Sequence, residues 1–199
     1  MSRDKKVLIY EAALSLVYEN NDLSAIKVAD IARRANIGKG TVYEYFQSKE
    51  QVIGEALIYR IQQGLQRFAR LLDEGLSFKE TYLAFLRHYK AMISKNWHIY
   101  NLMTMNPAHV AVHAAVHAVI YPRLRQLKDQ YFQLMERLVA RSVEEGIIKP
   151  DPDRFDWQTA VLSSITGIFL HQQFPADFPH LGDEEVLEKA YSVYVKLLS

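Results

Sequence analysis

The chain contains no cysteine, which excludes disulfides, a thiolate metal site and a cysteine nucleophile. It also lacks any apolar run approaching the roughly 18 residues that a membrane-spanning helix needs. The opening Met-Ser-Arg-Asp-Lys-Lys is followed by no apolar core long enough for a signal peptide. These absences predict a protein of the cytoplasm with no membrane partner.

Signatures of catalysis are also missing. The sequence holds no Gly-rich phosphate loop, no Gly-x-Ser-x-Gly and no His-Glu-x-x-His. Its carboxylates are scattered at salt-bridge spacing, as is usual on solvated helix faces. The sequence therefore predicts neither an enzyme nor a bound cofactor.

Strand signals are absent, whereas apolar residues recur at helical spacing along most of the 199 residues. Hydrophobic residues make up 49% of the chain, which is ample for a core. We therefore predict an all-α fold of about nine or ten helices. A break is expected at Asn96-Trp-His98. Breaks are also expected before Pro107 and near Pro122, because proline disfavours a helical conformation in the residue before it.

The run from Val28 to Phe46 predicts two short helices joined by a tight turn. Apolar residues at positions 28, 31, 32 and 35 form one helical stripe. Asn36-Ile37-Gly38 then stops the helix, since Asn and Gly tolerate the positive φ that a helix exit often needs. In the second helix Val42 and Phe46 face inward, which leaves polar side chains facing outward. This pattern is typical of a helix-turn-helix that enters a DNA major groove.

Helix-start signals extend the prediction along the chain. Ser24 is the expected N-cap of the first helix of this pair. Ser48-Lys-Glu-Gln51 and Ser77-Phe-Lys-Glu80 read as capping boxes that open long helices. Asp151-Pro152 and Asp183 are the expected starts of the last two helices.

The order Ile-Ala-x-x-Ala-x-Ile-Gly-Lys-Gly-Thr-Val-Tyr-x-Tyr-Phe-x-Ser-Lys-Glu, from Ile31 to Glu50, resembles the signature of TetR-family transcriptional regulators. The resemblance is nearly continuous from about Val7 to Leu57, and beyond it only the lengths and order of the helices are similar. It implies a helix-turn-helix DNA-binding domain at 1–50 and a helical effector-binding and dimerisation domain at 51–199. A helix from about 49 to 72 would link the two.

The resemblance also implies the contacts with DNA. Carried over by position, they fall on Lys27, Lys39, Gly40, Thr41, Tyr43, Tyr45 and Lys49. Lys27 stands where the family usually has a threonine that caps the helix, so here the phosphate contact would be a cation. Glu44 would repel phosphate, and it either accepts from a cytosine N4 amine or points away.

The charge balance gives limited support to DNA binding. The net charge of the chain is only +1, whereas nucleic-acid partners usually show a basic surplus. Between Ser24 and Lys49, five basic residues stand against two acidic ones. We therefore expect binding by a small, locally basic face.

The remainder of the chain carries two candidate sites, one for a small molecule and one for a metal. His109, His113 and His117 share one helix face, and imidazoles at i, i+4 can bind zinc or copper. The alternative is a polar stripe that lines a pocket or faces solvent. Soft and aromatic side chains would line a pocket for a lipophilic or aromatic effector, with plain core as the alternative: Phe85, Tyr89, Trp97, Tyr100, Met103, His113, His117, Tyr121 and His171.

Two long helices, 123–145 and 154–173, match the pair that forms the dimer interface in the family. Ser163, Ser164 and Gly167 would permit close approach of helices there. The preferred interpretation is a homodimeric, ligand-responsive repressor bound to a palindromic double-stranded operator. The alternative is a helical small-molecule-binding or scaffold protein whose DNA-binding head is not used.

Overall fold

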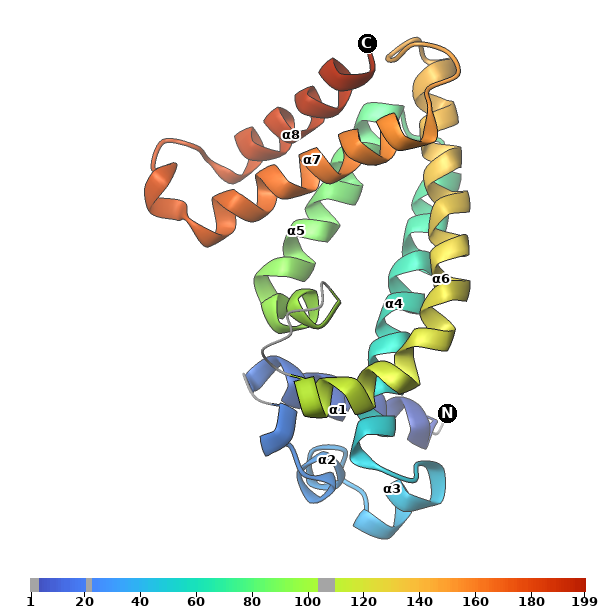
Figure 1. The fold of residues 1–199 in the computed structure, drawn as a ribbon, viewed down its shortest axis with the longest axis vertical. Coiled ribbons are helices and arrows are strands. Elements are labelled where there is room, and N and C mark those ends of the chain that lie inside the picture. The colour runs from blue at the N-terminus through green and yellow to red at the C-terminus, as the bar shows by residue number, and fades with distance from the viewer. Residues whose placement is uncertain (1–3, 21–22, 104–109) are drawn as a thin grey trace. The chain divides into compact units, whose positions relative to one another are not determined.

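The computed structural model describes residues 4–20, 23–103 and 110–199, and for residues 92–103 and 110–117 only the backbone. The described residues form eight α-helices and two short 3-10 helices, and no strand (Figure 1). The all-α prediction is confirmed, with slightly fewer helices than expected. The α-helices are α1 (Lys5–Glu19), α2 (Val28–Arg34), α3 (Lys39–Tyr45), α4 (Lys49–Asp73), α5 (Phe78–Met103), α6 (Val110–Glu144), α7 (Arg154–Gln173) and α8 (Asp183–Leu198).

The chain divides into two compact units. The first consists of residues 1–66 and 96–130, and the second of residues 67–95 and 131–199. Helices α4, α5 and α6 each begin in one unit and end in the other. The predicted boundary near residue 50 separates a DNA-binding part from an effector-binding part, whereas the two units are defined by contacts within each. That boundary stays a prediction.

The core of the first unit anchors both short helices. Ile9 of α1, Ile31 of α2, Val42 of α3 and Ile53 of α4 are all fully buried in one apolar cluster. Because α2 and α3 have only seven residues each, such helices are marginal alone and depend on this packing. The apolar spacing that predicted them is therefore also what holds them.

The second unit has an aromatic core with a small polar centre. The rings of Tyr82 and Tyr194 lie 4.6 Å apart, and Phe78 packs against both. The Tyr82 hydroxyl donates to Ser164 Oγ over 3.1 Å, and Ser164 donates to the Ala190 carbonyl over 2.8 Å. Burial strongly raises the pKa of Tyr82. This hydroxyl therefore stays protonated and links α5, α7 and α8.

Arg141 of α6 joins the end of α4 to the start of α5. Its guanidinium donates to the carbonyls of Leu72 and Leu76, over 2.7 Å and 3.0 Å, and to Thr81 Oγ1 over 3.2 Å. The carbonyls at the end of a helix have no partner within the helix. The arginine thus satisfies two acceptors where the chain turns from α4 into α5.

Two expected helix breaks do not occur. Helix α5 continues through Asn96-Trp-His98, whose residue types are only moderately poor helix formers. Helix α6 runs for 35 residues through Pro122. A proline inside a helix removes one hydrogen bond and bends the helix without having to end it, and Figure 1 shows α6 changing direction in its N-terminal part. The expected start after Pro107 lies outside the described residues.

Three predicted caps were displaced by one to three residues. Ser24 lies in the 3-10 helix Leu23–Ala25, and Lys27 is the N-cap residue of α2. Asp153 rather than Asp151 caps α7, with its carboxylate accepting from the Phe155 N–H over 2.7 Å. Asp183 is the first residue of α8, where it pairs with Lys90 instead of capping.

The predicted capping box is complete at α5, and only its first half forms at α4. The Glu80 N–H donates to Ser77 Oγ over 3.3 Å, and the Ser77 N–H donates to Glu80 over 3.0 Å. At α4 the Gln51 N–H donates to Ser48 Oγ over 3.1 Å, but the Gln51 side chain accepts from Gln47, one residue earlier than expected. None of the helices in the described part of the chain is long and apolar enough to cross a membrane.

Candidate nucleic-acid interface

A tight turn sets the relation between α2 and α3. Asn36 has a φ of 56°, its N–H donates to the Arg33 carbonyl, and the Ile37 N–H donates to the Ala32 carbonyl over 3.0 Å. This is a Schellman motif with Asn as the left-handed residue. Gly38 has a φ of −70° and is the N-cap residue of α3, so only Asn36 supplies the positive φ.

Helix α3 presents one anchored face and one exposed face. Val42 and Phe46 are 0% and 2% exposed, as the spacing predicted. Because successive residues turn by about 100° around the axis, Gly40 and Glu44 lie opposite these anchors. Lys39 with Tyr43 forms one flank of the exposed face, and Thr41 with Tyr45 forms the other. Tyr43 is 50% exposed and Tyr45 is 39% exposed, although both are large aromatic residues.

The exposed face of α3 carries one lysine held by an aromatic ring. Lys39 Nζ lies 5.7 Å from the centre of the Tyr43 ring, and a cation in that position is attracted to the ring face. The helix surface at Gly40 is open, since a Cβ added there would have no atom within 4 Å. The protein's own packing therefore does not require glycine at position 40.

Lys27 begins α2 with an exposed side chain. The Asp30 carboxylate accepts from the Lys27 N–H over 3.3 Å, and a lysine side chain cannot return a capping bond because it has no acceptor. Only half of a capping box forms. The ammonium group has no carboxylate within ion-pair distance in the described part of the chain, and it is available to an external anion.

Three of the five basic residues counted in the sequence have partners within the protein. Arg33 pairs with Asp30, and Arg34 makes two bonds of 2.7 Å to the Glu19 carboxylate. Lys49 is half-buried and donates to the carbonyls of Leu23 and Ser24, over 3.2 Å and 3.0 Å. The structure thus gives Lys49 a role in holding the loop before α2. Local charge counting overstates the cations that are available to DNA.

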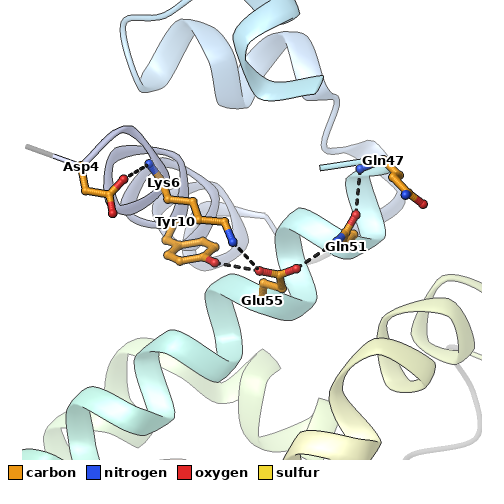
Figure 2. Close-up of polar contacts among 6 residues, drawn as sticks. All are labelled: Asp4, Lys6, Tyr10, Gln47, Gln51 and Glu55. Carbon is orange, nitrogen blue, oxygen red and sulfur yellow. Dashed lines mark hydrogen bonds and ion pairs between the residues drawn. The ribbon is translucent and has the colours of Figure 1, made fainter. Parts of the chain in front are cut away.

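A polar cluster connects α1 to α4 next to the exit of α3 (Figure 2). Glu55 Oε2 accepts from the Tyr10 hydroxyl over 2.8 Å and lies 3.5 Å from Lys6 Nζ. Glu55 Oε1 accepts from Gln51 Nε2 over 2.9 Å, and Gln51 Oε1 accepts from the Gln47 N–H over 2.8 Å. We call these four side chains, Lys6, Tyr10, Gln51 and Glu55, the Glu55 cluster.

The pKa values within the Glu55 cluster report an ionised carboxylate. Burial alone would raise the pKa of Glu55, but the hydrogen bonds from Tyr10 and Gln51 and the nearby Lys6 outweigh burial and lower it. Burial and the bond to Glu55 both raise the pKa of Tyr10, while the charge of Arg123 on α6 partly offsets them. The cluster is therefore a tyrosine donor paired with a charged acceptor. Sequence reasoning missed it, because only the Gln51–Glu55 spacing could have indicated it.

Helices α4 and α6 touch within the first unit, next to the Glu55 cluster. A Cβ added at Gly54 would lie 2.8 Å from Val119 Cγ1 and 3.0 Å from Val119 Cβ. Ile120 packs against the same apolar cluster as α1 to α4. Glycine at position 54 therefore allows α6 to approach closer than any other residue would.

The residues predicted to bind a small molecule are only partly brought together. Phe85 and Tyr89 are half-buried against the core of the second unit, and the Phe85 ring lies 5.2 Å from the ring of Phe68. Tyr121 is exposed on α6. His171 is half-buried on α7, where its Nε2 lies 3.0 Å from the Leu181 carbonyl oxygen. The side chains of Trp97, Tyr100, Met103, His113 and His117 lie outside the described residues.

The histidine stripe stays untested as a metal site. His109 lies outside the described residues, as do the side chains of His113 and His117. Elsewhere in the described chain, no group of three His, Cys, Asp or Glu side chains could hold a metal ion.

The arrangement of α1, α2 and α3, with a turn between the last two and an exposed polar face on α3, defines the helix-turn-helix class of domains. Residues 9–56 match the model of the bacterial regulatory proteins of the tetR family. The match covers 48 of the 199 residues, so these N-terminal residues are similar to the DNA-binding part of that family. The match agrees with the predicted helix-turn-helix type of domain over these residues.

Comparisons with individual proteins agree with this family. The chain is 32% identical over 80 residues to an uncharacterized HTH-type transcriptional regulator, YhgD, of Bacillus subtilis, covering 40% of this chain and 41% of that protein. It is 21% identical over 153 residues to the fatty acid metabolism regulator protein of the same organism, covering 76% and 74%. The crystal structure of FadR from Bacillus subtilis with stearoyl-CoA matches the fold with a TM-score of 0.63, at 16% identity and 97% coverage of both chains.

Proposed function

We propose that the protein is a sequence-specific regulator of transcription in the cytoplasm, which binds a palindromic operator as a homodimer and is released by a small lipophilic effector. The observation that carries this proposal is the exposed face of α3. Two large tyrosines are held in solvent beside a lysine and an unhindered glycine, and no packing within the described residues requires them there.

Contact with DNA follows from the residue types on that face. The hydroxyls of Thr41, Tyr43 and Tyr45 suit phosphate oxygens, which position a helix on the duplex without reading its sequence. Lys39 and Lys27 supply cations, and Gly40 lets the backbone of α3 come close to the groove. Because these groups lie on one short helix, each copy of the chain would read only one half-site.

An apolar stripe on α7 supports the homodimer. Phe155 is 75% exposed and Leu162 is 61% exposed, and Leu170 and Phe174 continue the stripe. Val193 and Leu197 of α8 are exposed as well, and a groove of about 230 Å³ lies between the two helices, with Ser163 and Gly167 in its wall. No large exposed apolar side chain lies on residues 131–144 of α6 in the described structure. We therefore place the interface on α7 and α8, rather than on the predicted pair 123–145 and 154–173.

The effector class is suggested by the relatives. One is a fatty acid metabolism regulator, and the FadR structure holds stearoyl-CoA, so a long-chain acyl thioester is the first effector to test. Release from DNA requires that the effector bind one arrangement of the two α3 helices more tightly than the other. Helices α4 and α6 run from one unit into the other and are the proposed carriers of that change.

The test is footprinting of the DNA that flanks the protein's own gene. We expect a protected palindrome for the natural protein, lost in Tyr43→Ala and weakened in Lys39→Ala. Lys149→Ala removes the same charge from an exposed residue of the second unit and should leave the footprint unchanged. Added acyl-CoA should reduce protection.

The alternative is a helical small-molecule-binding or scaffold protein whose head is not used. Under that alternative, selection from random DNA with the purified full chain would return no enriched sequence. The same result would reject the proposed function.

A further inference from the structure

Helix α3 carries one side chain that contradicts a simple phosphate-binding face. Glu44 is exposed, and in the part of the chain that the structure describes no hydrogen-bond or ion-pair partner neutralises its carboxylate. The other exposed side chains of α3 are a lysine and two tyrosines, and its threonine is half-buried. A lone carboxylate among them needs an explanation of its own.

The position of Glu44 on the helix supplies that explanation. Glu44 lies two residues from each of the two buried anchors, Val42 and Phe46, and so about 160–200° from both around the helix axis. It is the outermost side chain of α3. When a recognition helix lies in the major groove, the line opposite its anchored face meets the base edges and its flanks meet the two phosphate walls. Lys39 with Tyr43 and Thr41 with Tyr45 occupy those flanks.

We infer that Glu44 reads a cytosine in each half-site by accepting a hydrogen bond from its N4 amine. An ionised carboxylate can only accept hydrogen bonds. In the major groove guanine and thymine present acceptors to it, whereas cytosine presents the N4 donor and adenine presents a donor next to the N7 acceptor. The cytosine amine neighbours one acceptor, the O6 of its paired guanine, whereas the adenine amine lies between its own N7 and the O4 of the paired thymine, so cytosine is the base that repels the carboxylate least.

This inference rests on the proposed DNA binding and adds to it a residue that sets sequence preference. Repulsion between Glu44 and phosphate strengthens this sequence preference. A register that places Glu44 against the backbone is disfavoured, and a register that places it against the cytosine amine is favoured. The carboxylate would thus lower the affinity for random DNA and raise discrimination.

The test is selection from random DNA with the natural full-length chain and with Glu44→Gln, followed by competition against single-base variants of the selected site. We expect a C·G pair at one position of each half-site, preferred about tenfold or more by the natural protein. Glu44→Gln should lose that preference while its affinity for random DNA rises severalfold at low salt. Glu74→Gln removes an equal charge from an exposed residue outside α3, and it should change neither quantity.

The outcomes separate this inference from the proposed function. A selected palindrome whose base preferences are the same in Glu44→Gln would overturn the role of Glu44 and leave DNA binding standing. A preference for adenine that Glu44→Gln abolishes would overturn the assignment to cytosine. Thermal unfolding of Glu44→Gln, expected at the temperature of the natural protein, checks that the exposed substitution has not altered the fold.

Discussion

The hydroxyl of Tyr10 in α1 donates a 2.8 Å hydrogen bond to the Glu55 carboxylate in α4, although the two residues are 45 positions apart. The same carboxylate accepts a hydrogen bond from Gln51 Nε2. Gln51 Oε1 in turn accepts a hydrogen bond from the Gln47 N–H, just after α3. The bond therefore fixes α1 on α4 at the place where the chain leaves α3. Orientation of the exposed face of α3 depends on this cluster as well as on the apolar core.

Tyr10→Phe should lower the free energy of unfolding by about 1–2 kcal/mol, since a hydrogen bond to a charged group is lost while the ring remains. Tyr59→Phe is the matched control. The Tyr59 ring stacks on Tyr10 with 5.2 Å between centres, and its hydroxyl has no partner among the described residues. Urea denaturation measures both. Equal losses for the two variants would show that the bond to Glu55 adds no stability.

Glu55→Gln should flatten the acid side of the stability profile. The folded protein holds the pKa of Glu55 below its ordinary value of 4.5, so the unfolded chain binds a proton there more readily than the folded one. The stabilisation from Glu55 is then complete above pH 4.5 and is lost as the pH falls through the folded pKa. Denaturation midpoints measured from pH 6 downward should converge for Glu55→Gln and the natural protein at the acid end. Parallel curves would contradict this.

Gly54→Ala should destabilise the first unit by about 1–3 kcal/mol, because its Cβ would lie 2.8 Å from Val119 Cγ1 and the branched valine has little freedom to move. Combination with Val119→Ala removes the closest atom, so the loss in the double variant should be smaller than the sum of the single losses by at least about 0.5 kcal/mol. Strict additivity in a double-mutant cycle would mean that α6 can shift away freely.

Gly40→Ala should separate stability from DNA binding. A Cβ at Gly40 meets no atom within 4 Å, and alanine is the better helix former, so the free energy of unfolding should rise by up to about 1 kcal/mol. The added methyl group would nevertheless hold the backbone of α3 away from DNA, and operator affinity should fall. Thermal unfolding and a binding titration measure the two quantities. Unchanged affinity would remove Gly40 from the contact.

Leu162→Glu should convert the proposed dimer to a monomer, because it places a charge in the centre of the α7 stripe. Ala140→Glu adds the same charge to an exposed position on α6 and should leave the dimer intact. Light scattering of the full chain at several concentrations gives the mass of each. A dimer broken by Ala140→Glu alone would return the interface to the pair 123–145 and 154–173.

Local signals in the sequence predicted α3 and the turn before it well. The bounds of α7, the turn at Asn36, and the burial of Val42 and Phe46 all follow from periodicity and turn chemistry that act within a few residues. Helix breaks at Asn96 and Pro122 were wrongly predicted, because neighbouring turns and packing can sustain a helix through a single weak residue.

Contacts between distant residues were beyond the sequence. No spacing rule links Tyr10 to Glu55, and nothing in the sequence indicates that Lys49 bonds to carbonyls of the loop before α2. The count of basic residues near α3 was correct, yet it overestimated the number of cations available to DNA. Three of the five basic side chains bond to other groups of the protein. Which cations are available to a partner is decided by tertiary structure.

The acceptors that Arg141 binds after α4 include two main-chain carbonyls, those of Leu72 and Leu76. Substitution of either leucine side chain leaves its carbonyl in place. Mutational drift could therefore change the apolar side chains around this turn while one arginine keeps the turn from α4 to α5 closed. The side chains at this turn are free to diverge among descendants of this chain, provided that Arg141 is inherited unchanged.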